Sequence, residues 1–167
     1  WRTVAANVSL ALEAAKVPTD QRAARIAKVL ATVGLTAHAL KFPAQLSGGM
    51  QQRVQIARCL AQEPALMMMD EPFGALDAMT REGLQDELAR LVREQGLTVM
   101  FVTHDLEEAI YLGDRVIALR ANPTSDKPSL AAMIEVNIPR PRNQLETKEH
   151  PEFLRLRREL YHYLGHQ

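Results

Sequence analysis

Apolar residues recur at steps of three and four along the first third of the chain, which is the spacing of one face of an α-helix. Over residues 3–33 this pattern predicts two amphipathic helices, separated by a break that contains a proline. Thr19 or Asp20 is the expected N-cap of the second helix, and Gly34 is its expected C′ residue. A further helix is predicted from Met50 to Gln62, after a glycine-containing turn.

Beyond Pro64 the pattern changes to short apolar runs that end in polar residues, as buried parallel strands do. These runs alternate with helical segments, and strands that alternate with helices imply a parallel sheet with helical crossovers. The expected elements are a strand at 65–69, a helix at 78–95, a strand at 98–103, a short helix at 105–112, strands at 114–119 and 132–138 with a polar turn at 122–128 between them, and a closing helix at 149–164.

The fold class that these elements predict is α/β, with α-helices first and a parallel sheet with helices afterwards. We divide the chain into a helical subdomain at 1–62, an α/β part at 63–138, and a C-terminal linker and helix at 139–167. With 167 residues the chain is long enough for one domain, which would bury about two-thirds of its unfolded surface.

Charge and cysteine content narrow the classes of function. Lysine and arginine together number 20, as do aspartate and glutamate, so no overall field favours nucleic acid or anionic lipid. The single cysteine, Cys59, excludes an internal disulfide and a cysteine-built zinc site. We expect no membrane-spanning helix and no signal peptide, because the apolar runs are short and no apolar core near the start is followed by a cleavage site. A reducing, cytoplasmic setting is expected.

The segment Ser47-Gly48-Gly49 at the start of a predicted helix is a candidate anion site. Two glycines leave the backbone N–H groups bare where the helix dipole is positive, which suits a phosphate. The alternative is that Ser47 is only an N-cap and the glycines only a turn.

A second candidate site follows the strand at 65–69, where Asp70 and Glu71 emerge at the carboxyl end. Ligands of open parallel sheets bind at that edge. Asp70 could hold Mg²⁺, directly or through water, and Glu71 could orient and deprotonate a water for attack on a phosphoryl group. The alternative is a strand end capped by solvated acids.

His104 follows the next predicted strand and should reach the same sheet edge, where it could donate to a phosphate oxygen or position the attacking water. Asp77 precedes the helix predicted from Ala78, and its simplest role is to cap that helix. For His104 the alternative is likewise a structural role.

Four segments occur in an order that resembles the signature of ATP-binding-cassette (ABC) ATPases, and the resemblance covers essentially the whole chain. They are Leu46-Ser47-Gly48-Gly49-Met50-Gln51, Met69-Asp70-Glu71-Pro72, Ala75-Leu76-Asp77 and Thr103-His104-Asp105. The resemblance implies part of a RecA-like P-loop NTPase sheet with an α-helical subdomain, and it implies ATP and Mg²⁺ as the cofactors.

The resemblance also implies a role for each of these residues. Asp70 would be the magnesium residue of the Walker B motif, Glu71 the catalytic base and His104 the switch histidine. Asp77 would be the D-loop aspartate. Gly74 stands where the family often has serine, which removes one possible hydroxyl contact. The implied nucleotide-binding set, of which the signature loop contacts ATP held by a partner protomer, is Ser47, Gly48, Gly49, Met50, Gln51 and Asp77.

A phosphate-binding P-loop reads Gly-x-x-x-x-Gly-Lys-Ser/Thr, and none of the 8 glycines in this sequence is followed by lysine. In the family, the adenine-stacking aromatic and the Q-loop glutamine would precede Trp1. The resemblance therefore predicts an ABC ATPase domain without its N-terminal part, and we expect this chain alone to be inactive.

The complete subunit would hydrolyse ATP between two head-to-tail protomers and drive transmembrane permease subunits. It would lie peripherally at the cytoplasmic face of the inner membrane. An extracytoplasmic solute-binding protein would be an indirect partner, and nucleic acid would not be one. Residues 1–8, 73–77 and 139–153 are similar to importers of small anions such as nitrate, sulfonate, taurine or bicarbonate.

Several alternatives stay open. A soluble ABC protein acting on ribosomes or DNA usually carries tandem cassettes, coiled-coil inserts or basic arms, and none is seen in this sequence. A binding-only module is disfavoured by the presence of Glu71 and His104. An importer subunit for another small solute is the third alternative. The Arg140/Arg142 pair has its own simpler interpretation, a solvated linker stiffened by proline.

Overall fold

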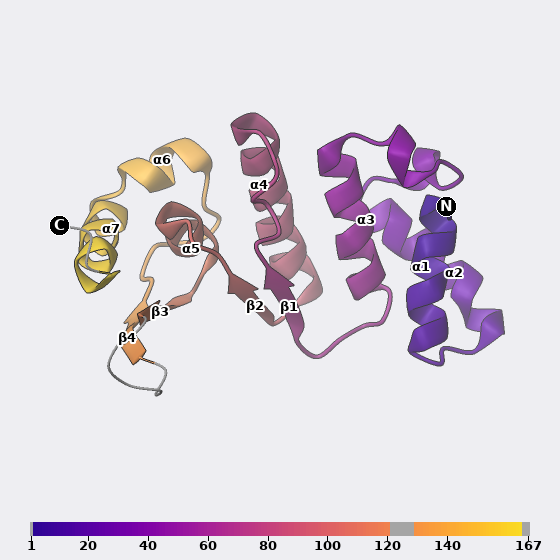
Figure 1. The fold of residues 1–167 in the computed structure, drawn as a ribbon, viewed down its shortest axis with the longest axis horizontal. Helices are drawn as coiled ribbons and strands as arrows, with labels where there is room; N and C mark the ends of the chain where they lie inside the picture. The colour runs from indigo at the N-terminus through magenta and orange to yellow at the C-terminus, as the bar shows by residue number, and fades with distance from the viewer. Residues whose placement is uncertain (1, 121–128, 165–167) are drawn as a thin grey trace.

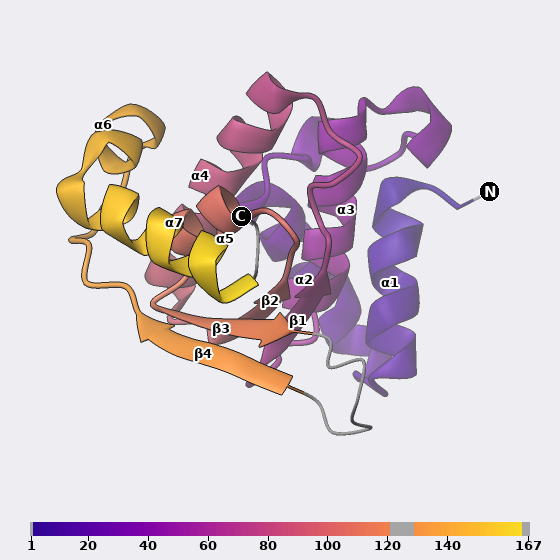
Figure 2. The same cartoon turned by 60° about the vertical axis from the view of Figure 1, so that its left-hand side comes forward.

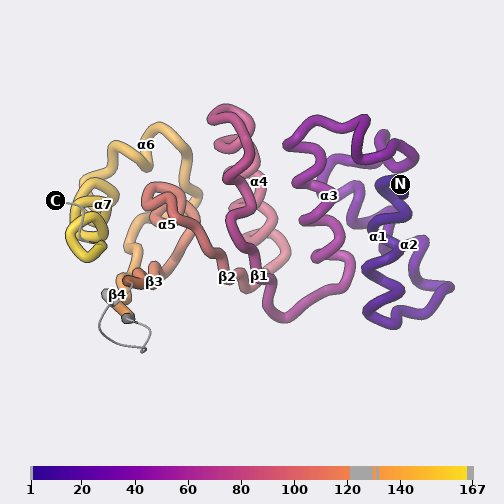
Figure 3. The backbone as a smooth tube through the Cα atoms, viewed as in Figure 1, coloured from indigo at the N-terminus to yellow at the C-terminus, as the bar shows by residue number. Residues whose placement is uncertain are grey.

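The computed structural model describes residues 2–120 and 129–164, which form seven α-helices, two 3₁₀ turns and four strands in the described part. The elements lie in a row (Figure 1). Helices α1, α2 and α3 are at one end, α4 with β1 and β2 is in the middle, and α5 to α7 with β3 and β4 are at the other. The backbone trace passes along this row in chain order (Figure 3).

The helical end consists of α1 (Val4–Ala14), α2 (Thr19–Thr32) and α3 (Gly48–Leu60), with 3₁₀ turns at Thr36–His38 and Pro43–Gln45. The predicted pair of helices is confirmed. Helix α1 packs on both α2 and α3, and a shared apolar cluster fills the space between them. Its fully buried members include Val4, Val8, Leu12, Ile56 and Ala57.

Of the two predicted ends of α2, the C-terminal one is confirmed and the N-terminal one is wrong. Gly34 has a φ of 68°, and the N–H of Leu35 donates to the carbonyl of Leu30 at 2.8 Å, so the predicted glycine C′ is confirmed. The predicted cap at Thr19 or Asp20 is wrong, because Pro18 occupies the N-cap position and no side chain caps the helix. Thr19 and Asp20 instead lie in its first turn.

The centre of the molecule is a parallel pair of strands, β1 (Met67–Asp70) and β2 (Val99–Val102), in which Met67 pairs with Val99 and Asp70 with Val102. Helix α4 (Ala78–Gln95) matches its predicted bounds and packs on one face of the pair through Leu84 and Leu88. The apolar runs are typical of buried strands, but an apolar face of this sheet was expected to be exposed in the chain alone, and this is confirmed. Met68 is 64% exposed, and Met100 and Val102 are also exposed, because the described chain covers only one face.

The C-terminal end contains α5 (Leu106–Leu112), β3 (Arg115–Arg120), β4 (Ser129–Glu135), α6 (Gln144–Glu149) and α7 (Pro151–Leu164). The third strand was expected to extend the parallel sheet. Instead β3 pairs with β4 in a separate antiparallel sheet, which α7 packs against (Figure 2). An antiparallel pair needs only a short return, whereas a parallel one needs a crossover. The polar turn predicted at 122–128 lies outside the described residues.

Two features of this end were not predicted. Asn143 caps α6 by accepting from the N–H of Glu146 at 2.8 Å. Arg142 was interpreted as part of a solvated linker, but its guanidinium is half-buried and donates to the carbonyls of Ile110, Tyr111 and Gly113 at the end of α5. This burial lowers the pKa of Arg142 to about 10. None of the helices in the described ranges is long and apolar enough to cross a bilayer.

Candidate functional site

The carboxyl ends of β1 and β2 bring Glu71 and His104 together. Glu71 directly follows β1, and its N–H donates to the carbonyl of Val102 at 2.9 Å. The N–H of His104 donates to Glu71 Oε1 at 3.0 Å, and His104 Nδ1 lies 2.7 Å from the same oxygen. The two residues predicted to be catalytic therefore form one constellation, at the sheet edge where the sequence placed them.

The backbone at Glu71 leaves the strand in an unusual conformation. Its φ is 45°, in the left-handed region, which costs a residue with a Cβ about 1–2 kcal/mol. The turn is held by the hydrogen bond to Val102 and by the N–H of Gly74, which donates to the Glu71 carbonyl at 3.3 Å. Non-glycine residues held in this region cluster at functional sites. The conformation directs the Glu71 side chain toward the loop that follows β2.

The electrostatics of the pair follow from this contact. The hydrogen bond to Glu71, and then its negative charge, raise the pKa of His104 above its ordinary value. If Nδ1 carries the proton it donates to Glu71, and Nε2 then has no hydrogen-bond partner among the described residues. The side chains are 81% exposed for His104 and 39% for Glu71, so the pair is open to a ligand.

Asp70 lies beside this pair at the last position of β1 and is exposed. Within the described ranges, no group of three or more His, Cys, Asp or Glu side chains could hold a metal ion. Mg²⁺ at phosphate sites is usually held by one or two carboxylates together with phosphate oxygens and water. Asp70 fits that donor set, with oxygens from a bound nucleotide supplying the remainder.

The second group of candidate residues gathers at the N-termini of α3 and α4. Ser47 Oγ accepts from the N–H of Met50 at 3.3 Å and caps α3. Asp77 Oδ1 accepts from the N–H of Thr80 at 3.0 Å and caps α4. Hydrogen bonds from Thr80 hold the pKa of Asp77 below its ordinary value. The simpler interpretations of Ser47 and Asp77 as caps are thus confirmed, and a nucleotide contact stays a prediction.

The two glycines of the signature segment, Gly48 and Gly49, lie where the start of α3 approaches the start of α4. A Cβ added to Gly49 would lie 2.7 Å from Thr80 Cγ2, and one added to Gly48 would lie 3.3 Å from Leu76 Cδ2. Gly49 is buried in this contact. The glycines therefore have a packing role that the sequence did not reveal, since their partners lie about thirty residues further along the chain.

The other two residues of the predicted nucleotide-binding set have structural contacts. Gln51 Nε2 donates to the carbonyls of Pro43 at 3.0 Å and Leu46 at 3.3 Å, which fixes the loop before the signature segment. Met50 is half-buried against the core of the helical end.

The two groups are connected by one loop. Glu71 begins it and Asp77 ends it, and between them Phe73 is buried and packs against Phe101 of β2. Within the described chain no hydrogen bond or ion pair joins Ser47 to Glu71 or His104.

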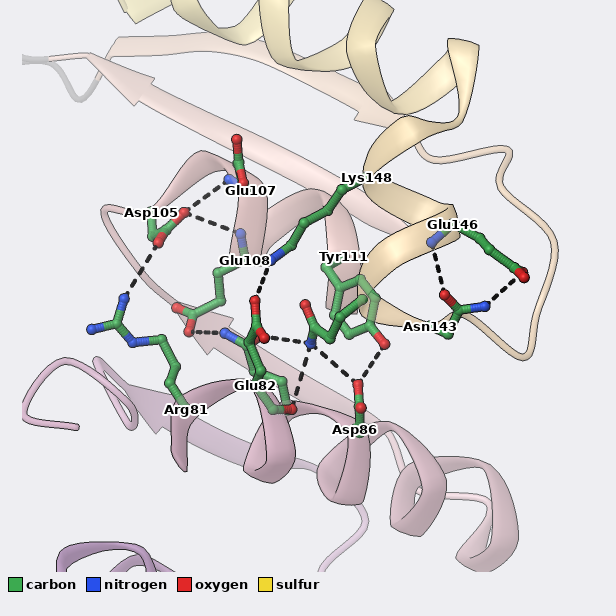
Figure 4. Close-up of polar contacts among 12 residues, drawn as sticks. Arg81, Glu82, Asp86, Asp105, Glu107, Glu108, Tyr111, Asn143, Glu146 and Lys148 are labelled. Atoms are coloured by element: carbon green, nitrogen blue, oxygen red, sulfur yellow. Dashed lines mark hydrogen bonds and ion pairs between the residues drawn. The ribbon is translucent and has the colours of Figure 1, made fainter. Parts of the chain in front are cut away.

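A polar network behind this loop was missed by sequence reasoning (Figure 4). Arg81 of α4 lies near Asp105, and Gln85 of α4 donates to Glu108 of α5 at 2.8 Å. Tyr111 donates to Asp86, and burial, together with this bond, raises the pKa of the phenol. No pattern in the sequence signals these pairs, because each joins residues more than twenty positions apart.

Comparison with known proteins gives a consistent result. Residues 2–74 match the family model described as ABC transporter. The nitrate import ATP-binding protein NrtC of Synechococcus elongatus is 45% identical over 169 residues, which include all of this chain and 25% of that protein. The aliphatic sulfonates import ATP-binding protein SsuB 1 of Xanthomonas axonopodis pv. citri is 47% identical over 86% of this chain and 56% of its own length.

A solved structure supports the same assignment. An inward-facing ABC transporter assigned to the metal-chelate type aligns with a TM-score of 0.64 and 27% identity, over 69% of this chain and 47% of the other. The chain spans a quarter of the length of NrtC and just over half that of SsuB 1. In its motifs, its sheet edge and its relatives, the chain is similar over its whole length to ATP-binding proteins of the ABC transporter family.

Proposed function

We propose that these residues form part of the ATP-hydrolysing subunit of an importer. The observation that carries the proposal is the contact of Glu71 with His104 at the carboxyl edge of β1 and β2. A carboxylate held there by a histidine and by a backbone N–H is placed to act on a water beside bound phosphates. The match to the ABC transporter family model and the similarity to ATP-binding proteins support ATP as the substrate.

In the proposed reaction a water oxygen bonds to the γ-phosphorus, and the bond from that phosphorus to the bridging oxygen of ADP breaks. Glu71 accepts the proton of the water, and His104 keeps the Glu71 carboxylate oriented and presents Nε2 toward the γ-phosphate. Asp70 would hold Mg²⁺, which when bound neutralises charge on the phosphate oxygens. The carboxylate and the imidazole need little movement, because the pair is already formed.

The second half of each site would come from a partner protomer in a head-to-tail dimer. Ser47, Gly48 and Gly49 lie at a helix N-terminus, which favours an anionic ligand. Met50, Gln51 and Asp77 complete that surface. In support of the shared arrangement, Ser47 forms no hydrogen bond or ion pair with Glu71 or His104 among the described residues.

For the cargo we propose a small anion of the nitrate, bicarbonate or sulfonate type, since the relatives are named as ATP-binding proteins of nitrate import, bicarbonate transport and aliphatic sulfonate import. The ATPase would lie peripherally at the cytoplasmic face of the membrane and dock on permease subunits. An extracytoplasmic binding protein would deliver the solute to that permease.

Replacement of the proposed base tests the proposal in the full-length subunit that contains these residues. Glu71→Gln should slow ATP hydrolysis by roughly 10²–10⁴-fold, because the amide cannot accept the proton of the water. ATP binding should be retained, and the ATP-bound dimer should persist. Steady-state phosphate release, nucleotide binding and gel filtration in ATP measure the three effects.

The matched control is Glu94→Gln. Glu94 is an exposed glutamate of α4 that pairs with Arg90, and its loss should leave turnover unchanged. Turnover of Glu71→Gln at the wild-type rate would remove Glu71 from the mechanism.

A further inference from the structure

Arg81 makes contacts on two sides of the proposed site. It lies in the first turns of α4, four residues after Asp77. Its Nη2 donates to the carbonyl of Leu76 at 2.9 Å, so it holds the residue immediately before Asp77. Its Nη1 lies 4.0 Å from Asp105 Oδ2, an ion pair drawn in Figure 4. One guanidinium therefore bridges the loop after β1 and the loop after β2.

The Asp105 side of this bridge is itself well fixed. Asp105 Oδ1 accepts from the N–H groups of Glu107 at 2.9 Å and Glu108 at 3.2 Å, which caps α5. The other carboxylate oxygen, Oδ2, faces Arg81. Asp105 directly follows His104, so any shift of Asp105 toward or away from α4 also moves the histidine that contacts Glu71.

A second contact, one turn further along α4, supports the same alignment. Gln85 and Glu108 are 4% and 6% exposed, and Gln85 Nε2 donates to Glu108 Oε1 at 2.8 Å. Gln144 of α6 also donates to Gln85 Oε1 at 3.0 Å, so the amide is held from both sides. Helices α4 and α5 are thus held in register by successive polar contacts, and Arg81 is the one nearest to the site.

We propose that Arg81 is a positioning residue that keeps the loop ending at Asp77 and the loop carrying His104 in a fixed relation to each other. The inference rests on the proposed function and deepens it. Asp77 would face the nucleotide of the partner's half-site, whereas His104 acts in the chain's own half-site. Arg81 would therefore link the two sites of the dimer through a single side chain.

The test uses the full-length subunit with Arg81→Met, Arg81→Lys and the control Arg90→Met. Arg90 lies on the same helix, and in the described structure its only ion pair is with Glu94. Arg90→Met therefore removes one positive charge from α4, as Arg81→Met does, but leaves the contacts between the two loops in place. Arg81→Met should lower kcat for ATP hydrolysis by roughly 3- to 30-fold. KM for ATP should be unchanged, because no nucleotide contact is removed. Lysine has one ammonium for two acceptors and should restore only part of the rate.

A double-mutant cycle with Asp105→Asn identifies the bridge. Asparagine caps a helix as well as aspartate does, so this variant should remove only the charge that faces Arg81. The double variant Arg81→Met/Asp105→Asn should then be no slower than Arg81→Met alone. Additive losses, a raised KM, or turnover of Arg81→Met equal to that of Arg90→Met would each overturn the proposal.

Amide hydrogen exchange provides a readout independent of activity. Residues 74–77 and 103–105 should both exchange faster in Arg81→Met than in Arg90→Met, at the same midpoint of urea unfolding. If the wild-type subunit does not hydrolyse ATP, the proposed function fails, and joint loosening of the two loops still decides whether Arg81 positions them. Exchange that is unchanged, or faster in one loop only, would contradict the positioning role.

Discussion

Ser47 and Asp77 each cap a helix, and each is also a residue to which the family resemblance assigns a nucleotide contact. Their capping roles could be predicted because a cap depends only on residues within one turn. The contact of Glu71 with His104 could be predicted in outline, since both follow strands of one parallel sheet. The left-handed backbone at Glu71 could not, because it is imposed by Val102 and Gly74 and leaves no local signal.

The close approach of Gly49 to Thr80 allows a prediction about the stability of the fold. Gly49→Ala should destabilise the protein by roughly 1–3 kcal/mol, because the new methyl would lie 2.7 Å from Thr80 Cγ2 between two packed helices. Thr80→Ser removes that methyl while keeping the backbone N–H that Asp77 accepts from, so the double variant should recover most of the loss. Urea unfolding of the full-length subunit measures both.

Gly83→Ala is the matched control. Gly83 lies in the interior of α4, and a Cβ there would meet nothing within 4 Å. Alanine is the better helix former and should stabilise the protein by about 0.5–1 kcal/mol. Equal effects of the two substitutions would show that Gly49 is not needed for the approach of α3 to α4.

At the scale of elements, prediction succeeds where both ends of an element carry local signals. Helix α4 has Asp77 at its N-cap and Gly96 in the left-handed region at its end, with a φ of 62°, and its bounds agree with the prediction. The start of α2 was wrong because Pro18 begins that helix without a side-chain cap. The partner of β3 was wrong because strand pairing depends on contacts that an alternation of apolar runs does not encode.

The cap of α4 allows a prediction at this scale that separates structure from function. Asp77→Ala should lower the midpoint of unfolding, because the N–H of Thr80 loses its acceptor, whereas Asp77→Asn should keep the midpoint. If the carboxylate is also needed in the partner's site, both variants should lower turnover. Thermal unfolding and phosphate release distinguish the two roles.

The pH dependence of the Asp77 cap has a definite sign. The pKa of Asp77 is lowered in the folded state, so the carboxylate stabilises the fold above its ordinary pKa of about 3.9. That contribution is lost as pH falls through the lowered folded value. The difference between wild type and Asp77→Ala should therefore shrink in acid and be constant near neutrality. A difference that grows on acidification would rule out this account of the cap.

At the scale of the whole molecule, the described chain has three apolar clusters instead of one. One fills the helical end, one lies between α4 and the β1–β2 pair, and one joins α5 and α7 to the β3–β4 sheet. The sequence predicted the order of the elements along this row. It did not predict Arg142 at the end of α5, because that contact joins positions about thirty residues apart and resembles a solvated linker until the fold is known.

The exposed face of the sheet supports a prediction for the chain as given. Residues 1–167 contain no Gly-x-x-x-x-Gly-Lys-Ser/Thr segment, and the apolar side chains of Met68, Met100 and Val102 are exposed on β1 and β2. We expect these residues alone to show no Mg²⁺-dependent ATPase activity and no specific ATP binding, since Glu71 has nothing to act on unless phosphates are held in line.

Isothermal titration with Mg-ATP, beside the full-length subunit as the positive control, is the measurement. Micromolar binding by residues 1–167 would mean that the phosphate-binding groups lie within this chain and have been missed.

Helix α4 contributes buried side chains to two of these clusters. Leu91 belongs to the cluster of the helical end, and Leu84 and Leu88 belong to the cluster against β1 and β2. If α4 lost its order, both clusters would be opened to water at once, whereas fraying of α1 or α7 would open only one. Loss of order in α4 should therefore unfold the helical end and the centre together, whereas the cluster that joins α5 and α7 to the β3–β4 sheet contains no buried α4 residue.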